Sequence, residues 1–451
     1  MKIVIIGLGT IGRTVLRTLS GEGHTITIID VDRNKIESLI ERYDVFGVVG
    51  NGACMDIQKE AKVGGADLVI ALMRGDEMNI LAALVAKKLG ARSTVARVRN
   101  PDYRAQTLDM REDLGISMIV NPELETANEI YNLISLPSVA QIERFAKGRA
   151  LLVEIVAKEG SPLVGETLIS LGKKLKTRVL ICAVQRGADV YIPGGHFEIQ
   201  AGDKIHLTSD AKALGDFLAE VELEKSRFRN IMIVGGNRSS YYLANDLSKK
   251  KYAVKLLEPD RAMAEELADA LPRVTVVLGD GTSQELLREE GVEAMDAFVA
   301  LTDNDEENII VSMFSNKMKV KKTITKVKSD NLHGMLDELG IMNHVSPKII
   351  VANRIVSYIR ALSNDKGSNV LTLYRLVGEQ VEALEFAART QERFLNTPLK
   401  YLDMKKNCLI ACIIRHNKVI IPDGNAEIQL GDNVVVVTTH KNFDDLKDVF
   451  Q

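Results

Sequence analysis

Short apolar runs alternate with segments of helical period over the first 125 residues of the chain. The segment 80–89 repeats its apolar positions with the helical period. The Val- and Ile-rich runs lie at residues 2–6, 25–29, 45–49, 67–72 and 93–98. This alternation is typical of βαβ units. Because a run such as 26–29 is apolar throughout, we expect strands that are buried on both faces, in a parallel sheet with helices on each side.

The pattern of the first half of the chain returns in the second half. Ile3-Val4-Ile5-Ile6-Gly7 recurs as Ile231-Met232-Ile233-Val234-Gly235, 228 residues further on, and Gly50-Asn51-Gly52 recurs as Gly279-Asp280-Gly281, at a spacing of 229. The register also holds later in each half, since Pro193 and Gly195 match Pro422 and Gly424. A period this long indicates a duplicated pair of modules and not a solenoid repeat.

Each half is therefore predicted to hold two modules of different fold. The first is a Rossmann-like, doubly wound parallel sheet, and the second is a small α+β module with short strands, such as 150–156, and glycine-rich turns. We expect the first sheet module over 1–124, a helical connection over 125–148, the first small module over 149–225, the second sheet module over 229–347, a helical connection over 348–365 and the second small module over 366–451. The charged segment Glu222–Arg227 is the predicted joint between the halves.

A glycine fingerprint follows the first predicted strand and opens the first predicted helix. It reads Gly7-Leu8-Gly9-Thr10-Ile11-Gly12. In this context Gly7 permits the tight turn, Gly9 lets the backbone approach a pyrophosphate, and Gly12 lets the helix pack closely on the strand. The phosphates are expected at the start of the helix, where free amides and the helix dipole favour negative charge.

Polar residues at other predicted strand ends complete the expected nucleotide cleft. Asp30 ends the second strand, 18 residues after Gly12, which suits a carboxylate that binds ribose hydroxyls and repels a 2′-phosphate, so NAD(H) is favoured over NADP(H). The further candidates for this cleft are Asn51, Gly52, Met73, Arg74 and Arg97. For Arg97, contact with phosphate and a solvated, helix-facing or interface position are both open.

The second copy departs from the fingerprint. Gly235 keeps the first glycine, whereas Asn237 and Ser240 replace the second and third. Asn tolerates a left-handed backbone, but its side chain crowds the place expected for the pyrophosphate. Glu258 stands where Asp30 stands in the first copy. We therefore expect a degenerate site, able at most to take an adenosine portion through Glu258 and Asp280.

Composition narrows the classes of function. The chain has 58 Lys and Arg against 61 Asp and Glu, so it lacks the basic excess of a nonspecific nucleic-acid binder. No apolar run approaches the roughly 18 residues of a membrane helix, and no signal peptide opens the chain, so a cytoplasmic protein is expected. The cysteines match no zinc or redox spacing and are predicted to be buried thiols, two of them in a strand; they are Cys54, Cys182, Cys408 and Cys412.

No residue set indicates catalysis or a metal site. The seven histidines are scattered, and none recurs as histidine in the other half. A nicotinamide enzyme needs a group for proton transfer or nucleophilic attack beside the cofactor, held by a substrate domain, and the small modules are short for that role. A nucleotide-sensing regulator is favoured; an NAD-dependent oxidoreductase and a structural ring protein stabilised by nucleotide are the alternatives.

A sheet module followed by a small α+β module resembles the regulator-of-potassium-conductance domains. A chain that carries this pair of modules twice is similar to the regulatory subunits of Trk-type potassium uptake systems. The residues that carry the likeness are Gly7–Gly12, Asp30, Gly50-Asn51-Gly52, Asp76-Glu77-x-Asn79 and Ala96-Arg97-Val98-Arg99. The resemblance implies NAD(H) or ATP/ADP in the first cleft and sheet modules that assemble into a homo-oligomeric ring, as a dimer or tetramer. It also implies a membrane-embedded potassium channel or transporter partner of the TrkH/TrkG type on the inner face of the membrane. The helical stretch 134–144, with Pro137, is a predicted hinge.

Overall fold

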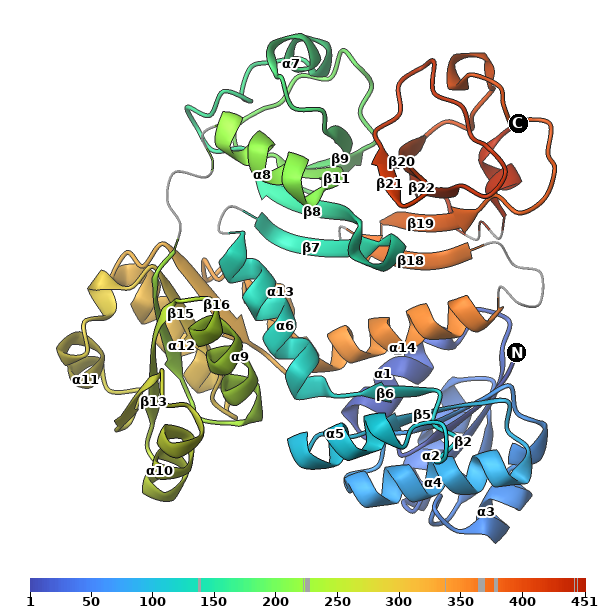
Figure 1. The fold of residues 1–451 in the computed structure, drawn as a ribbon, viewed down its shortest axis with the longest axis vertical. Coiled ribbons are helices and arrows are strands. Elements are labelled where there is room, and N and C mark those ends of the chain that lie inside the picture. Colours follow the sequence, from blue (N-terminus) through green and yellow to red (C-terminus); the bar gives the residue numbers. More distant parts are fainter. Residues whose placement is uncertain are drawn as a thin grey trace. The chain divides into compact units, whose positions relative to one another are not determined.

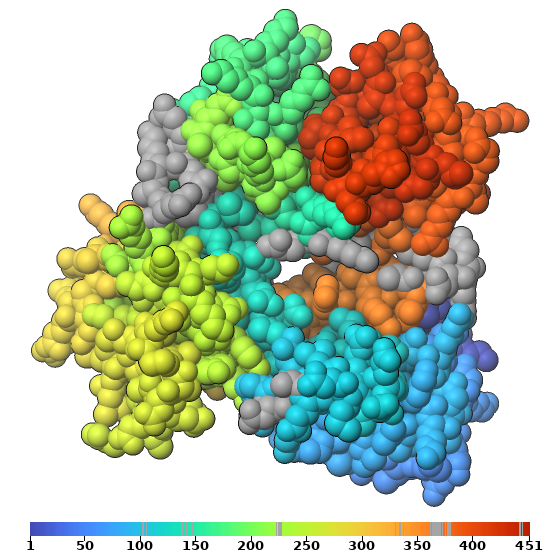
Figure 2. All heavy atoms as spheres, viewed as in Figure 1, coloured from blue at the N-terminus to red at the C-terminus, as the bar shows by residue number. Residues whose placement is uncertain are grey.

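The structure is a computed structural model that describes residues 1–136, 139–221, 223, 228–336, 338–363, 370–376, 380–441, 443 and 445–451 (Figure 1). It divides into two compact units. The first joins Met1–Tyr131 with Arg229–Ile359, and the second joins Asn132–Phe228 with Arg360–Gln451. Each unit therefore combines one module from each half of the chain. Figure 2 shows the surfaces of these modules from the same side, coloured along the sequence.

The first module is a six-stranded parallel sheet in the order β3-β2-β1-β4-β5-β6. Its strands are β1 (Lys2–Ile6), β2 (Thr25–Asp30), β3 (Phe46–Val49), β4 (Leu68–Ala71), β5 (Ser93–Arg97) and β6 (Met118–Val120). Its helices are α1 (Thr10–Leu19), α2 (Arg33–Arg42), α3 (Met55–Glu60), α4 (Asp76–Leu89), α5 (Pro101–Asp109) and α6 (Pro122–Ser135). The five predicted strands are confirmed, and β6 is an additional one. The order in which strands are added to the sheet reverses between β1 and β4: β2 and β3 extend the sheet on one side, and β4, β5 and β6 extend it on the other. Ligands of open α/β sheets bind at such a switch point.

Burial explains the apolar character of β1. Val4 and Ile6 pack in one cluster with Ala82 and Ala86 of α4. Ile5 is equally buried, and because side chains alternate along a strand it lies on the opposite face of the sheet. Both faces of the central strands are therefore covered, as the uninterrupted apolar runs predict.

The second copy repeats this sheet in the order β14-β13-β12-β15-β16-β17. Its strands are β12 (Asn230–Val234), β13 (Ala253–Glu258), β14 (Thr275–Leu278), β15 (Ala297–Ala300), β16 (Lys322–Lys326) and β17 (His344–Val345). Its helices are α9 (Arg238–Lys249), α10 (Arg261–Ala270), α11 (Gln284–Glu289), α12 (Asp305–Lys317), α13 (Asp330–Leu336) and α14 (Pro347–Ser363). The fold class predicted for both sheet modules is thus confirmed.

The second unit holds two five-stranded antiparallel sheets, in the orders β10-β9-β11-β8-β7 and β18-β19-β22-β20-β21. The first comprises β7 (Val139–Phe145), β8 (Ala150–Val156), β9 (Leu180–Arg186), β10 (Asp189–Tyr191) and β11 (Lys204–Asp210), with α7 (Leu168–Lys174) and α8 (Ala211–Glu220). The second comprises β18 (Val370–Leu376), β19 (Val381–Ala387), β20 (Cys408–Arg415), β21 (Lys418–Ile420) and β22 (Asn433–Thr438). Short 3₁₀ turns at Leu399–Tyr401 and Leu446–Val449 accompany it.

The two antiparallel sheets share a core. Leu152 of β8 and Ala383 of β19 belong to one buried cluster, whereas Leu151 and Val153 belong to a separate cluster within their own module. The buried Glu385 carboxylate accepts from the backbone amide of Ala146 at 3.0 Å. Successive side chains of β8 therefore point to opposite faces of its sheet, and both faces are buried.

Four expectations need correction or fall outside the described residues. The helical connection predicted over 125–148 is helical only to Ser135, because residues 139–145 form β7, which pairs with β8 at the edge of its sheet. Cys54 is exposed, although Cys182, Cys408 and Cys412 are buried as predicted. Pro137 of the predicted hinge and most of the predicted joint, residues 222 and 224–227, lie outside the described residues. Among the helices that the structure describes, none is long and apolar enough to cross a membrane.

Candidate functional site

The turn from β1 into α1 can be built only with glycine at two positions, one in the loop and one in the first turn of the helix. Gly7 has φ of +92°, and a Cβ there would lie 2.8 Å from the backbone carbon of Leu72. A Cβ on Gly12 would lie 2.1 Å from the carbonyl oxygen of Gly7. The turn and the close packing of α1 on β1 therefore both depend on the missing side chains.

Gly9 differs, because a Cβ there would meet no described atom within 4 Å. This residue is the N-cap of α1, and its backbone is extended, with φ of −69° and ψ of −168°. Among the described side chains, none caps the start of α1. Free amides at a helix N-terminus beside open space are the groups that bind phosphate.

Asp30, at the end of β2, lies directly beside this loop. Its carboxylate accepts from the backbone amide of Leu8 at 2.7 Å and from that of Asp32 at 3.0 Å. The ammonium of Lys35 lies 3.8 Å from one of its oxygens. Since each carboxylate oxygen can accept two hydrogen bonds, Asp30 retains capacity for ribose hydroxyls while it braces the glycine loop. That bracing role is absent from the sequence prediction.

Asn51 and Gly52 form a tight turn after β3. The Asn51 Oδ1 atom accepts from the amide of Ala53 at 3.0 Å, so the side chain stabilises its own turn. A Cβ on Gly52 would lie 2.1 Å from Cγ2 of Ile6, which explains the glycine by close packing on β1.

Arg97 braces the loop after β4. Its guanidinium donates to the carbonyl oxygens of Met73 at 2.6 Å and Arg74 at 3.0 Å. Burial, followed by the nearby charge of Arg99, lowers the pKa of Arg97. Of the two interpretations open for Arg97, these contacts support neither phosphate binding nor solvation, because the charge is partly buried and bound to carbonyl oxygens.

Two buried polar side chains complete this edge of the sheet and were not among the predicted site residues. The Asn79 amide accepts from the Met73 amide at 2.7 Å and donates to the carbonyl oxygens of Met73 and Arg97 at 3.0 and 2.9 Å. Asp76 accepts from the amides of Arg99 and Asn100 at 2.9 and 2.8 Å. Their recurrence as Asp305 and Asn308 is the sequence signal that could have identified them.

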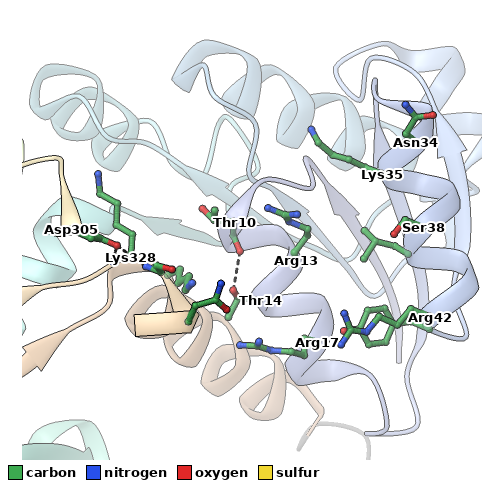
Figure 3. A pocket seen from close by; sticks show the side chains of 15 residues that line it. Thr10, Arg13, Thr14, Arg17, Asn34, Lys35, Ser38, Arg42, Asp305 and Lys328 are labelled. Carbon is green, nitrogen blue, oxygen red and sulfur yellow. Dashed lines mark hydrogen bonds between the residues drawn. The ribbon is translucent and has the colours of Figure 1, made fainter. Parts of the chain in front are cut away.

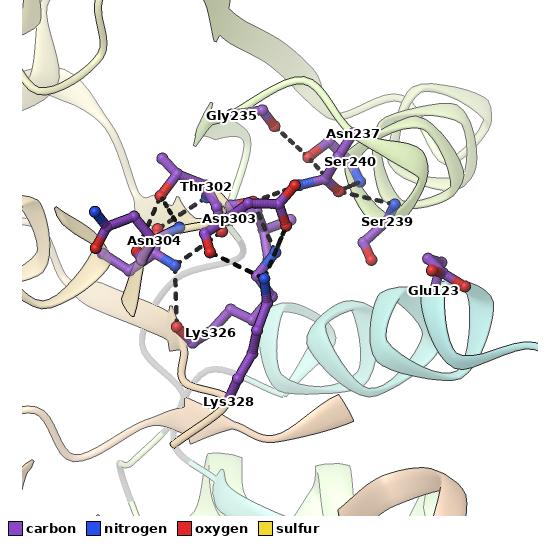
Figure 4. Close-up of polar contacts among 12 residues, drawn as sticks. Glu123, Gly235, Asn237, Ser239, Ser240, Thr302, Asp303, Asn304, Lys326 and Lys328 are labelled. Atoms are coloured by element: carbon purple, nitrogen blue, oxygen red, sulfur yellow. Dashed lines mark hydrogen bonds and ion pairs between the residues drawn. The ribbon is translucent and has the colours of Figure 1, made fainter. Parts of the chain in front are cut away.

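The second copy has closed the corresponding helix start (Figure 4). The Asn237 Oδ1 atom accepts from the amides of Ser239 and Ser240 at 3.0 and 3.3 Å, and its Nδ2 donates to the carbonyl oxygen of Leu301 at 2.5 Å. The Ser240 hydroxyl donates to the carbonyl oxygen of Gly235. The amides that could hold phosphate at α9 are therefore occupied by the helix's own cap.

The acidic side chains of the second copy also accept hydrogen bonds from backbone amides. Glu258 accepts from the amides of Gly236 and Asp260 at 2.6 and 2.9 Å. Asp280 accepts from the amide and the hydroxyl of Thr282 at 2.8 and 2.7 Å. Lys326 occupies the position of Arg97, and burial lowers its pKa. The scaffold of the first cleft is thus present, but its phosphate position is closed. Among the described residues, no group of three or more His, Cys, Asp or Glu side chains could hold a metal ion.

Comparison with known proteins follows the same division into modules. A family model described as the TrkA-N domain matches residues 3–122 and 231–347, and one described as the TrkA-C domain matches residues 152–222 and 383–451. The Trk system potassium uptake protein TrkA homolog 1 of Methanosarcina mazei is 32% identical over 444 residues, 97% of each chain. A solved structure of the GsuK channel bound to NAD has a TM-score of 0.63 at 17% identity, covering 98% of this chain and 77% of that one. A structure of GsuK bound to ADP has a TM-score of 0.52 at 14% identity, covering 81% and 70%.

Proposed function

Because the chain belongs to the family of proteins built from TrkA-N and TrkA-C domains, we propose that it is the nucleotide-binding regulatory subunit of a potassium uptake system. The observation that carries this proposal is the uncapped start of α1 beside the open space at Gly9. The proposed role is to bind a nucleotide and report its presence to a membrane-embedded potassium channel or transporter subunit at the inner face of the membrane.

The ligand we propose is NAD(H), with ATP or ADP able to occupy the same cleft. The pyrophosphate would lie at the amides that follow Gly9, and Asp30 would receive the ribose hydroxyls, which disfavours a 2′-phosphate. The proposed contacts of the first cleft are Gly7, Leu8, Gly9, Thr10, Ile11, Gly12, Asp30, Asn51, Gly52, Met73 and Arg74. Arg97 acts through the loop at Met73. At the second copy, a pyrophosphate is not part of the proposal, because Asn237 fills its place.

Regulation requires the nucleotide to bind two conformations of the assembly unequally, since equal affinity shifts no equilibrium. The first sheet module holds the open cleft. The second copy of this sheet module belongs to the same compact unit. We propose that homo-oligomeric assembly of the sheet modules transmits this difference to the membrane partner.

The test is Gly9→Asp, which places a carboxylate where the phosphate would lie. A Cβ fits at Gly9, so the variant is expected to fold. Gly65→Asp is the matched control, because Gly65 is exposed and its Cβ position is also free. We expect Gly9→Asp to abolish binding of NADH and ATP and the nucleotide response of potassium uptake, whereas the control retains both. The proposal fails if Gly9→Asp loses nucleotide binding but uptake still responds to nucleotide. It also fails if the wild type turns NADH over as an oxidoreductase does.

A further inference from the structure

One tyrosine of the second sheet module contacts the carboxyl edge of the first sheet module. Tyr242 lies in the second turn of α9, and its hydroxyl oxygen accepts from Nδ2 of Asn121 at 3.2 Å. The same hydroxyl lies 3.5 Å from the carbonyl oxygen of Arg99, to which Nδ2 of Asn121 also donates, at 3.1 Å. Burial, opposed by the hydrogen bond from Asn121, raises the pKa of Tyr242, so this hydroxyl is protonated at neutral pH. The two copies of the fold are thus joined through a polar contact at the end of β5.

Arg99 is tied in turn to a loop of the nucleotide cleft. Asp76, at the start of α4, accepts from the amide of Arg99 at 2.9 Å. Two residues before Arg99, the guanidinium of Arg97 donates to the carbonyl oxygens of Met73 and Arg74 at 2.6 and 3.0 Å. Met73 and Arg74 are proposed contacts of the nucleotide. Because coupling between sites is carried by such contiguous contacts, a nucleotide that moves this loop also moves the carbonyl group that faces Tyr242.

The helix that carries Tyr242 is fixed to its own sheet (Figure 4). The Asn237 Oδ1 atom accepts from the amides of Ser239 and Ser240 at the start of α9. Its Nδ2 atom donates to the carbonyl oxygen of Leu301, directly after β15, at 2.5 Å. The cap that closes the second phosphate position therefore also joins α9 to the second sheet, and a displacement of Tyr242 is passed to that sheet.

The duplication shows that the opposite contact is not made. Thr14 stands at the position of Tyr242 in the first copy, and Ser346 stands at the position of Asn121 in the second. The Thr14 hydroxyl donates to the carbonyl oxygen of Thr10 within α1, at 2.8 Å (Figure 3). The buried Ser346 hydroxyl has no partner among the described residues. On this side a pocket lies between α1 and the second sheet module, where the other side has the tyrosine.

The charged residues beside these positions differ in the same sense. The Nε atom of Arg99 donates to the Glu123 carboxylate at 2.6 Å, which braces the edge that Tyr242 contacts. The corresponding positions of the second copy hold Lys328 and Lys348, two cations that cannot form an ion pair with each other. The first edge therefore has an internal brace that the second edge cannot reproduce.

We propose that Tyr242 is a positioning residue that couples the nucleotide cleft of the first copy to the second sheet module. This inference rests on the proposed function, because it requires a nucleotide in the first cleft. It also gives the second copy a role that needs no ligand. The cap at Asn237 that excludes phosphate holds the helix that responds to the first cleft.

The test measures hydrogen exchange of the α9 amides in the full chain, with and without saturating NADH. We expect NADH to slow exchange in α9 of the wild type at least about fivefold, although α9 contributes no proposed contact to the nucleotide. In Tyr242→Phe this slowing should fall below about twofold. The Kd for NADH should stay within about threefold, because α9 is folded in nearly every molecule and the Kd reports that form.

Tyr241→Phe is the matched control. It removes the same hydroxyl from the neighbouring residue of α9, whose hydroxyl forms no hydrogen bond among the residues that the structure describes. It should behave as the wild type. A purely structural role of Tyr242 would speed exchange by the same factor with and without NADH, and the ratio of the two rates would not change. Asn121→Ser should lower this ratio as Tyr242→Phe does, and Asn121→Ser/Tyr242→Phe should lower it no further.

The inference is overturned if NADH binds the wild type but leaves exchange in α9 unchanged, if Tyr242→Phe keeps the wild-type ratio, or if Tyr241→Phe loses it equally. In each of these cases NADH still binds, so the proposed nucleotide site stands. Absence of NADH binding by the wild type would overturn the inference and the proposed ligand together.

Discussion

Replacing Gly9 by Asn would give α1 the cap that closes α9. Gly9 and Asn237 are both N-cap residues with extended backbones, at φ of −69° and −125°. A Cβ at Gly9 meets no described atom within 4 Å, so the Asn side chain has room. In the second copy the Asn237 Oδ1 atom accepts hydrogen bonds from two backbone amides at 3.0 and 3.3 Å. We therefore expect the side chain introduced by Gly9→Asn to accept from the amides of Ile11 and Gly12 in the same way.

The two consequences of Gly9→Asn have opposite signs. A hydrogen bond to a charged group contributes about 1.5 to 3 kcal/mol, so the loss of two amides to the phosphate costs about 3 to 6 kcal/mol of binding free energy. Each 1.4 kcal/mol is a factor of ten, so the Kd for NADH should rise by at least about 100-fold. Folding stability should rise by a few tenths of a kcal/mol, since Asn is a slightly better N-cap than Gly.

Fluorescence titration with NADH and hydrogen exchange of the amides at the start of α1 measure these two effects. Gly9→Ala is the matched control, because it adds a Cβ in the same space but no acceptor. We expect its Kd to stay within tenfold of the wild type. If Gly9→Asn binds NADH as tightly as the wild type while the exchange data show the new cap, the amides at α1 do not hold the phosphates.

Three further predictions concern the scaffold. Gly12→Ala should destabilise the first module by about 1 to 3 kcal/mol, because its Cβ would lie 2.1 Å from the Gly7 oxygen; an unchanged thermal midpoint would contradict this. Burial, followed by the nearby charge of Lys204, lowers the pKa of His206 from 6.5 to about 4, although a Glu154 oxygen lies 3.5 Å from its ring. Between these two pH values, His206 binds a proton only in the unfolded state. The free energy of unfolding is therefore at its maximum above pH 6.5 and falls by up to about 3 kcal/mol towards pH 4. Urea unfolding against pH should show this slope, and His206→Gln should flatten it. Arg186→Met should lower the free energy of unfolding, measured with urea, by about 3 to 5 kcal/mol, because it removes the hydrogen bonds at 2.8 and 2.7 Å to the buried Asp203 carboxylate. If Arg186→Lys and Arg186→Met lose equal stability, the bidentate pair is not the cause.

The sequence predicts most strongly those features that local pattern determines. The strands of the first sheet follow from apolar runs, and the turn at Gly7 follows from the spacing of its glycines. The strand over 139–145 was wrongly included in a helical connection, because short apolar segments fit either period and the pairing of β7 with β8 decides. The contacts of Arg97 were also beyond prediction, since they depend on carbonyl groups more than twenty residues away in the chain.

The duplication within the chain distinguishes residues that hold the fold from residues that leave room for a ligand. Asp30 and Glu258 make the same pair of backbone contacts in their two loops, at 2.7 and 3.0 Å in one and 2.6 and 2.9 Å in the other. Since Glu258 makes these contacts in a module whose helix start is closed by Asn237, a carboxylate at the end of the second strand is explained without any nucleotide.

The same reasoning applies to the buried amides of Asn79 and Asn308, each of which joins two carbonyl oxygens and one amide at the carboxyl edge of its sheet. What separates the two copies is the absence of a side chain at Gly9 and Gly12, against Asn237 and Ser240. The specific argument for a nucleotide in the first module therefore rests on these two glycines, because every other polar contact compared between the clefts also serves the closed one.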